Sequence, residues 1–258
     1  MTFIRYEYAD GLARITLADG ERGNPLHIAS AAELFGAVRQ ASSDRARVIL
    51  LRAEGRFFSV GGDLAAFAEA PDRSAYIDDL AESLHRVVSE LQRSQAIVVA
   101  AVQGHAAGAG FPLAAAADVL VAAENVRFSF GYNRVGLSPD GGSTLLTRTL
   151  GLHRTLRLAL LGEPLEAQEA HEAGLVAAVV AGHRLEAHVD EVVRTLLELP
   201  TQAQAETKRL IRQHVTADLE AALRDETLGI RAHAGTGDGE EGIGAFLEKR
   251  KPRFEQAR

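Results

Sequence analysis

Two apolar segments that each lead into a glycine-rich turn constrain the fold of this chain more than any other feature. Residues 47–51 (RVILL) precede the turn FFSVGGD at 57–63, and residues 97–102 (IVVAAV) precede GHAAGAG at 104–110. Short apolar runs rich in Val and Ile and bounded by glycine are typical of buried strands. Strands that alternate with helices favour layered packing. The sequence therefore predicts an α/β fold with a partly parallel sheet.

Strand and helix patterns alternate through the first half, and the chain becomes mostly helical after about residue 142. Further strands are predicted at 3–8 and 12–17, paired around a turn at Asp10–Gly11, and at 119–122. Helices are predicted at 28–40, 74–92, 145–150, 156–161, 167–172, 185–199, 203–215, 219–232 and from 240 to about 250. Residues 234–239 (AGTGDG) are expected to be the most flexible stretch.

Composition and charge exclude several classes of protein. The chain has 258 residues, a net charge of -7 and no cysteine, so nucleic acid is a poor partner and cysteine-based sites are absent. Acidic and aromatic residues interrupt the N-terminal segment MTFIRYEYADG, which does not resemble a signal peptide. No apolar run reaches the length of a membrane span. We therefore expect a cytoplasmic protein that binds neither nucleic acid nor membrane.

The two glycine turns have two interpretations. Each presents backbone N–H groups at the end of a strand, and turns at adjacent strand ends can aim two N–H groups at one oxygen, which is an oxyanion hole. Alternatively, the glycines only permit tight turns and close packing. Neither turn carries a phosphate-loop or dinucleotide-binding motif, which disfavours nicotinamide and flavin enzymes.

Several segments, in their order and spacing, resemble the crotonase superfamily, the enoyl-CoA hydratase/isomerase family. They are NPL at 24–26, FFSVGGDL at 57–64, AVQGHAAGAG at 101–110, AAAADVLVAAENVRFSF at 114–130, GLSPDGGSTLLTRTLG at 136–151, EAHEAGLV at 169–176 and FLEKRKPRF at 246–254. The resemblance implies a ββα superhelix at 1–195 and a helical C-terminal trimerisation region at 196–258. It also implies an acyl-CoA thioester ligand without a further cofactor or metal, and a homotrimer or dimer of trimers.

The resemblance also implies site residues. The amides of Gly62 and Ala109 correspond to the family's oxyanion hole, although Ala109 replaces the common glycine. This replacement is compatible with the role if the backbone there suits a residue with a Cβ. Arg22, Lys251 and Phe254 occupy positions that touch the phosphates or adenine of CoA in relatives, the last two across a subunit boundary. The substrate-binding residues implied are Arg22, Leu26, Val60, Gly61, Asp63, Leu64, Tyr132, Lys251 and Phe254.

Both glutamates of the family's hydratases are replaced. Pro112 stands two residues after the second glycine turn, where the first glutamate is found, and Tyr132 stands near the position of the second. Proline carries no proton, and a phenol with a pKa of about 10 is a poor base at neutral pH. A hydration mechanism with two glutamates is therefore disfavoured.

Asp140 is the remaining candidate for proton transfer. From the local sequence, an aspartate just before a helix that begins near Gly141 is predicted to be an N-cap. The resemblance implies a second role, because an acid at this position carries the proton in isomerases of the family, among them the ring-epoxide isomerase of phenylacetate breakdown. The hypothesis is an acyl-CoA double-bond isomerase in which Asp140 moves a proton between two carbons.

Other polar residues and other functions also have competing interpretations. Asp63 is predicted to be structural or capping more than substrate-binding, and His85 to be a surface or packing residue. His153, His171 and His183 have no metal-ligand spacing with nearby acids. A hydratase with unusual acid/base residues and a non-catalytic acyl-CoA-binding relative remain alternatives. A serine protease of the related Clp type is disfavoured, because no Ser, His and Asp are recognisable in the required roles.

Overall fold

The computed structural model describes residues 2–215 and 218–254, and its main sheet confirms the predicted α/β class. This six-stranded sheet has the order β1-β2-β3-β4-β6-β9, and its strands are β1 (Ile4–Ala9), β2 (Leu12–Leu17), β3 (Val48–Ala53), β4 (Ile97–Val102), β6 (Val119–Ala123) and β9 (Ala178–Val180). The β1–β2 hairpin is antiparallel, as predicted, and the other neighbours are parallel. The central strands β3 and β4 are buried along most of their length, which explains their continuous apolar runs.

A small second sheet lies at the ends of the central strands. It consists of β5 (Ala106–Ala107), β7 (Arg127–Ser129) and β8 (Leu165–Glu166). Parallel bridges from Leu26 to Gly62 and from Ser59 to Ala106 join the first glycine turn to the N-terminal segment and to the second turn. These short pairings fix the two turns against each other.

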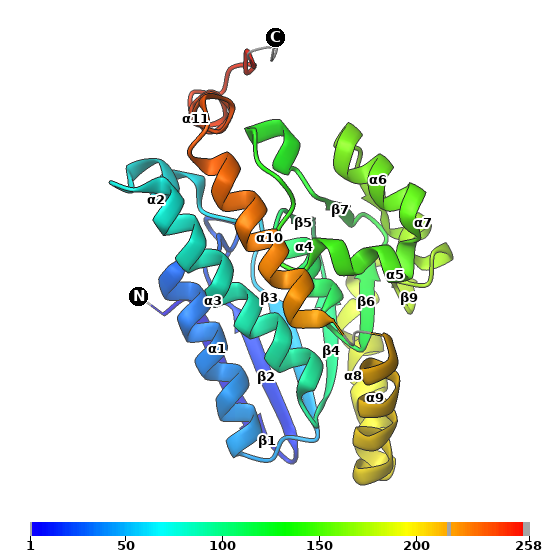
Figure 1. Ribbon diagram of the computed structural model, residues 1–258. Coiled ribbons are helices and arrows are strands. Elements are labelled where there is room, and N and C mark those ends of the chain that lie inside the picture. The colour runs from blue at the N-terminus through cyan, green and yellow to red at the C-terminus, as the bar shows by residue number, and fades with distance from the viewer. Residues whose placement is uncertain (1, 216–217, 255–258) are drawn as a thin grey trace.

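Helices cover both faces of the main sheet. They are α1 (Ile28–Ser43), α2 (Leu64–Glu69), α3 (Arg73–Arg93), α4 (Gly110–Ala115), α5 (Thr147–Leu150), α6 (Leu152–Leu161), α7 (Ala167–Glu172), α8 (Leu185–Glu198), α9 (Thr201–Val215), α10 (Leu219–Ala234) and α11 (Gly237–Leu247), with 3-10 turns η1 (Tyr132–Val135), η2 (Ser143–Leu146) and η3 (Gly182–Arg184). The long helix α3 lies between α1 and α10 (Figure 1), and α8 packs against the sheet strands. Helix α10, from the C-terminal part, therefore lies side by side with a helix of the core.

The helical second half of the chain differs from the prediction in two places. Residues 237–239 were expected to be flexible but form the first turn of α11, because Thr236 caps the helix by accepting the N–H of Gly239 at 3.2 Å. Gly242 lets α11 approach η1, since a Cβ there would lie 2.3 Å from the backbone of Val135. The predicted helix at 145–150 is divided between η2 and α5. Residue 195 lies within α8, and the division at this residue stays a prediction.

A buried ion pair fastens α9 to the sheet. Lys208 lies 2.8 Å from Asp118 and donates to the carbonyls of Leu91 and Ala96 at 2.9 Å. Asp118 also accepts from Arg212 and from the N–H of Val98, at the start of β4. These contacts explain why a lysine on α9 is buried: the lysine joins the C-terminal helices to the core.

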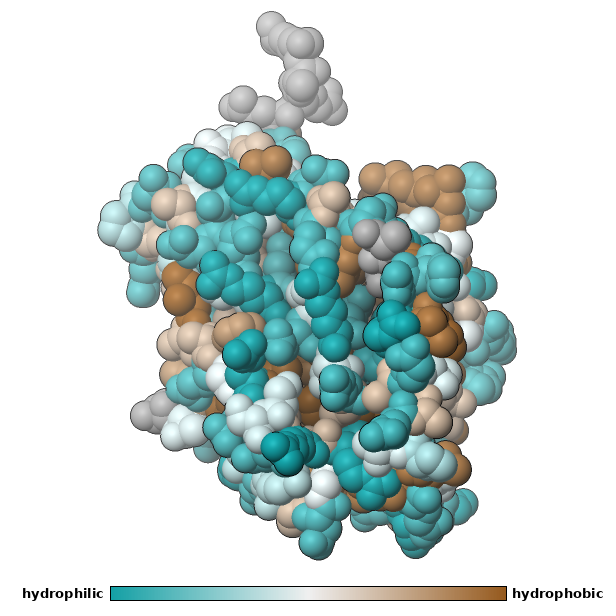
Figure 2. All heavy atoms as spheres, turned by 60° about the horizontal axis from the view of Figure 1, so that its bottom comes forward, coloured by the Kyte–Doolittle hydropathy of each residue, from teal (hydrophilic) through white to brown (hydrophobic). Residues whose placement is uncertain are grey.

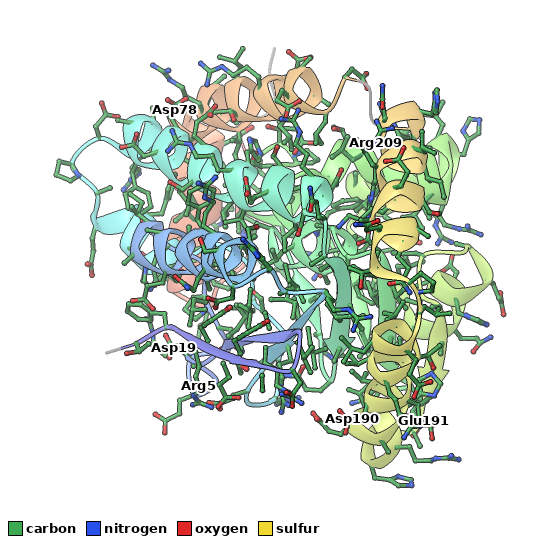
Figure 3. The ribbon with its side chains drawn as sticks, turned by 90° about the horizontal axis from the view of Figure 1, so that it is seen from below. Arg5, Asp19, Asp78, Asp190, Glu191 and Arg209 are labelled. Carbon is green, nitrogen blue, oxygen red and sulfur yellow. The ribbon has the colours of Figure 1, made fainter. Side chains whose placement is uncertain are left out.

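Most charged side chains lie at the periphery. Viewed from below, Asp190 and Glu191 on α8 and Arg209 on α9 point outward (Figure 3). The surface in Figure 2 is mainly hydrophilic, with hydrophobic patches near its edges. Four leucines of α6 are exposed: Leu152, Leu156, Leu160 and Leu161. Within the described residues, no helix combines the length and apolar character needed to cross a membrane.

Candidate active site

The two glycine turns meet because β3 and β4 are adjacent and parallel, so that both strands end at the same edge of the sheet. Gly61 has a φ of +86°, and a Cβ at this position would lie 2.7 Å from the carbonyl oxygen of Ala107. The carbonyl of Gly61 also accepts the N–H of Leu26 at 2.8 Å. A glycine is therefore required at 61 both for its backbone conformation and for the close approach of the second turn.

The amides of Gly62 and Ala109 lie next to this junction. Within the described part of the chain, neither N–H donates to another protein group. Ala109 has φ −63° and ψ −17°, in the right-handed helical region, and stands directly before α4. A residue with a Cβ adopts this conformation without strain, so alanine can replace glycine here without displacing the amide.

Both amides border a cavity of about 260 Å³. The predicted site residues that line it are Val60, Gly62, Leu64, Ala109, Tyr132 and Asp140. Apolar side chains from α3, η1, α10 and α11 complete the wall: Ile77, Leu80, Leu84, Val135, Ile230 and Phe246. Asp140 is the only carboxylate among the lining residues in the described ranges. The cavity thus joins a mainly apolar chamber, which Ser129 and Arg134 also border, to two free amides and one acid.

Asp140 is buried, and its main chain is held by hydrogen bonds from two hydroxyl groups. The hydroxyl of Tyr132 donates to the carbonyl of Asp140 at 2.9 Å, and that of Ser143 donates to the same oxygen at 2.6 Å. The expectation that Asp140 caps a helix starting near Gly141 is wrong. The 3-10 turn η2 begins at Ser143, with Gly142 before it, and no side chain caps it. The carboxylate is therefore free for another role.

His85, predicted to be a surface or packing residue, is buried on the packed face of α3 and contacts this carboxylate, a contact that the sequence did not predict. Its Nε2 lies 2.9 Å from Oδ1 of Asp140 and 3.2 Å from the N–H of Gly141, while Nδ1 lies 3.1 Å from the hydroxyl of Thr227 on α10. Burial lowers the pKa of His85, but the carboxylates of Asp140 and Glu226 outweigh this effect and raise it above its ordinary value. The imidazole is thus coupled to the acid that lines the cavity.

Glu226 fixes the segment that follows Asp140. Its carboxylate accepts the N–H groups of Gly142, Ser143 and Thr144, at 2.7, 3.2 and 2.7 Å, and bonds the Thr144 hydroxyl. Burial, together with the negative charge of Asp140, raises the pKa of Glu226 against the effect of these donors. Its oxygens are occupied by these hydrogen bonds. We therefore interpret Glu226, His85 and Asp140 as a hydrogen-bond network and not as a metal site, although one donor atom from each lies within 4.8 Å of the others.

The sequence held a signal for His85 and Glu226. The buried residues of α3 include Ile77, Leu84 and Val88, and His85 shares their face. Glu226 likewise shares the buried face of α10 with Leu219, Leu223 and Ile230. A titratable residue on the apolar stripe of an amphipathic helix requires a buried partner. This pattern marks both residues, but only the packing of the two helices identifies Asp140 as the partner.

The remaining residues that were predicted to bind substrate do not line the cavity. Asp63 caps α2 by accepting the N–H groups of Ala65 and Ala66 at 3.2 Å, as predicted, and lies 2.6 Å from Arg22. Burial opposes ionisation of Asp63, but these partners lower its pKa. Leu26 is buried beside Gly62. Lys251 and Phe254 are exposed beyond α11 and do not line the cavity of this protomer.

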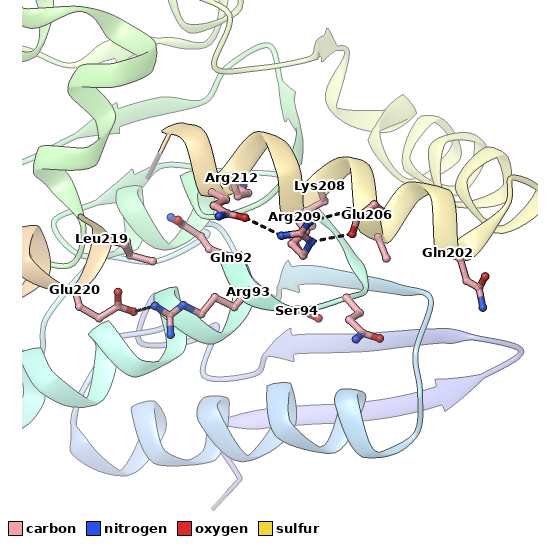
Figure 4. Close-up of a pocket in the computed structure, with 13 residues that line it drawn as sticks. Gln92, Arg93, Ser94, Gln202, Glu206, Lys208, Arg209, Arg212, Leu219 and Glu220 are labelled. Atoms are coloured by element: carbon pink, nitrogen blue, oxygen red, sulfur yellow. Dashed lines mark hydrogen bonds and ion pairs between the residues drawn. The ribbon is translucent and has the colours of Figure 1, made fainter. Parts of the chain in front are cut away.

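A larger hollow of about 610 Å³ lies between the end of α3 and helices α9 and α10 (Figure 4). Its charged side chains are paired: Arg93 with Glu220 at 2.6 Å, Arg209 with Glu206 at 2.7 Å, and Lys208 and Arg212 with Asp118, which lies outside the lining. It therefore contains no free acid or base of the kind that Asp140 provides. The smaller cavity between the glycine turns is the better candidate for an active site.

Comparison with known proteins agrees with this geometry. The family model described as enoyl-CoA hydratase/isomerase matches residues 7–257. The chain belongs to this family. A solved structure of an enoyl-CoA hydratase from Mycobacterium avium subsp. paratuberculosis superposes with a TM-score of 0.90 at 32% identity, covering 98% of this chain and 99% of that one. The crotonase fold with C-terminal helices is thereby confirmed.

Relatives within the family have different activities. The chain is 34% identical to 1,2-epoxyphenylacetyl-CoA isomerase of Escherichia coli over 98% of both chains. It is also 34% identical to trans-2-decenoyl-[acyl-carrier-protein] isomerase of Streptococcus mutans over 97% of both. The identity to 2,3-dehydroadipyl-CoA hydratase of E. coli is 35% over 93% of both. The family thus establishes an acyl-CoA enzyme, and the choice between isomerase and hydratase depends on the site residues.

Proposed function

We propose that this chain is an acyl-CoA double-bond isomerase in which Asp140 is the proton carrier. The observation that carries the proposal is that Asp140 is the one carboxylate among the described residues that line a mainly apolar cavity. Moving a double bond needs one group that removes a proton and returns it to another carbon, whereas hydration also needs a group that activates water. Pro112 and Tyr132 do not supply that second group.

The reaction follows from the positions of three residues. The thioester carbonyl accepts from the amides of Gly62 and Ala109, and the acyl chain occupies the apolar chamber. Asp140 removes a proton from the α-carbon of a 3-enoyl thioester, and the negative charge moves to the thioester oxygen. One such amide donor stabilises an oxyanion transition state by about 3 kcal/mol. Asp140 then protonates the γ-carbon and the double bond moves into conjugation.

The other substrate contacts belong to the same proposal. Val60, Leu64 and Tyr132 shape the acyl end of the cavity, and Leu26, Gly61 and Asp63 support the first glycine turn. Arg22, Lys251 and Phe254 bind the phosphates or adenine of CoA, with Lys251 and Phe254 acting across a subunit boundary. No cofactor beyond CoA is required. A cytoplasmic location stays a prediction.

The proposed assembly is a homotrimer or a dimer of trimers. The exposed leucines of α6 support it, because Leu152, Leu156 and Leu160 form a stripe at helical spacing on the surface. Sedimentation of the purified protein is expected to give three or six times the mass of the chain. A chain that sediments only as a monomer would contradict the proposal.

Ultraviolet absorbance of the conjugated thioester tests the reaction. We expect absorbance to rise with a 3-enoyl-CoA, and Asp140→Asn to lower kcat by about 100- to 10,000-fold while leaving ligand affinity largely intact. The matched control is Asp190→Asn on the exposed surface of α8, which should retain full activity.

Three results would contradict the proposal. Falling absorbance with a 2-enoyl-CoA would show that water is adding, and would establish the hydratase alternative. Unchanged turnover in the Asp140→Asn variant would exclude this residue as the proton carrier. Ligand binding without turnover of linear or ring substrates would indicate the non-catalytic relative.

A further inference from the structure

His85 lies between two separate hollows. On the inner side, its Nε2 contacts the carboxylate that lines the acyl cavity, at 2.9 Å. On the outer side, His85 contributes to a groove of about 290 Å³ between α1, α3 and α10, together with Glu82, Arg86 and Arg224. The imidazole itself is buried. A single side chain therefore connects the acid in the cavity with the molecular surface.

Hydrogen bonds continue from His85 toward that groove. Nδ1 of His85 lies 3.1 Å from the hydroxyl of Thr227, which is fully buried. Burial raises the pKa of Glu82, but hydrogen bonds from Arg224 and Thr227 outweigh this and lower it, so Glu82 is ionised. The Glu82 side chain is 36% exposed. Asp140, His85 and Thr227 thus form a continuous chain of proton donors and acceptors that runs from the cavity to the wall of the groove, which the partly exposed Glu82 also lines.

We propose that this chain is a proton relay through which Asp140 exchanges its proton with solvent while an acyl group fills the cavity. The inference rests on the proposed function and deepens it. An acyl chain in the cavity removes water from the inner side of Asp140, so the outer side is the route left open. His85 and Thr227 do not touch substrate; they act through Asp140.

The relay gains one proton from the substrate for each proton that it releases to solvent. Asp140 takes a proton from the substrate carbon and passes it to Nε2 of His85, which has its other proton on Nδ1. The imidazolium releases the Nδ1 proton to the Thr227 hydroxyl, which turns from the Leu223 carbonyl, its acceptor at 3.3 Å, and passes its own proton to water in the groove. One proton enters from the substrate and one leaves to solvent. Reversal of the steps returns a solvent proton to Asp140 for delivery to the γ-carbon.

The charged groups around His85 come from each element packed against it. Asp140 faces it from the loop before η2, Glu226 and Arg224 from α10, and Glu82 and Arg86 from its own helix α3. The carboxylates nearest the ring favour its protonated form, which is the intermediate of the relay.

Isomerisation of a 3-enoyl-CoA in D₂O tests the relay, with the deuterium content of the product measured by mass spectrometry at early conversion. We expect the wild type to place solvent deuterium in most product molecules. His85→Asn and Thr227→Val should each lower the labelled fraction by roughly five-fold or more, because the proton then stays on Asp140 between the two carbons. Thr227→Val keeps the imidazole and the side-chain shape, so it tests the relay even if His85→Asn loses turnover. His171→Asn, on α7, is the matched control and should label as the wild type does.

The outcomes separate the two proposals. Turnover with equal labelling in wild type, His85→Asn and Thr227→Val would overturn the relay and leave the isomerase standing. Absence of turnover in the wild type would overturn the isomerase, and the relay with it. If the labelled fraction falls in both variants and the His171→Asn control labels as the wild type does, the result would support the isomerase and the relay.

Discussion

At the residue scale, the backbone conformations of two small residues determine how the glycine turns meet. Gly61 has φ +86° and lies against the backbone of Ala107, whereas Ala109 lies in the right-handed helical region. The two positions therefore differ in what they tolerate. A side chain is forbidden at 61 by conformation and by contact, and is acceptable at 109.

We expect Gly61→Ala to lower the free energy of unfolding by about 2 kcal/mol or more and to reduce kcat strongly, because the two turns must separate. Ala109→Gly should lower the free energy of unfolding by only about 0.5–1 kcal/mol and lower kcat less than ten-fold. Urea unfolding and steady-state kinetics measure both effects. Gly36→Ala is the matched control, since Gly36 lies in α1 and a Cβ there has no neighbour within 4 Å. Equal losses from Gly61→Ala and Gly36→Ala would contradict the argument.

The sequence allowed the two turns and Asp140 to be predicted, because each belongs to a short local pattern of glycines or follows one. The surroundings of Asp140 were not predictable in this way. His85 and Glu226 are 55 and 86 positions away from Asp140 in the sequence, and only the packing of α3 against α10 brings them to it. The prediction that His85 is a surface or packing residue missed its contact with Asp140, because the sequence does not show which buried partner an apolar stripe will meet.

At the element scale, α10 determines the shape of the loop that holds Asp140. Glu226 on this helix accepts three consecutive backbone N–H groups of residues 142–144. Most element boundaries in the first half were predictable from periodicity, since β1, β2, β4 and α3 are regular and amphipathic or fully apolar. The short strands β7 and β9 were not, because three residues carry too little periodicity.

We expect Glu226→Gln to lower the free energy of unfolding by about 3 kcal/mol and to reduce kcat. A glutamine offers one acceptor oxygen where the carboxylate offered two, and its NH₂ group would face backbone N–H groups. Urea unfolding measures the stability and absorbance of the conjugated thioester measures the rate. Asp225→Asn, the exposed neighbour on the same helix, is the control and should change neither. If Glu226→Gln unfolds and turns over like this control, α10 does not position the loop.

At the scale of the whole molecule, the C-terminal helices contribute to the wall of the candidate active site. Ile230 of α10 and Phe246 of α11 line the cavity, and Lys208 of α9 is held in the core by Asp118. Burial of charged residues at these junctions costs free energy unless their partners are in place. Folding of the C-terminal region and formation of the acid site are therefore coupled.

This coupling predicts how stability depends on pH. The pKa of His85 in the folded chain is raised above its ordinary value of about 6.5, because Asp140, Glu226 and Glu82 outweigh the effect of burial. The stabilisation from the protonated ring is thus fully present below about pH 6.5 and is lost as pH rises through the folded pKa. The free energy of unfolding of wild type minus that of His85→Asn should therefore shrink as pH rises.

Urea unfolding of both proteins across this range, at one protein concentration, measures the difference. Asp140→Asn removes the nearest carboxylate, so His85 in that background should titrate at lower pH and its stabilising contribution should disappear earlier. A difference between wild type and His85→Asn that grows with rising pH would mean that the folded chain holds His85 as a neutral ring, and that its contact with Asp140 does not favour the charged form.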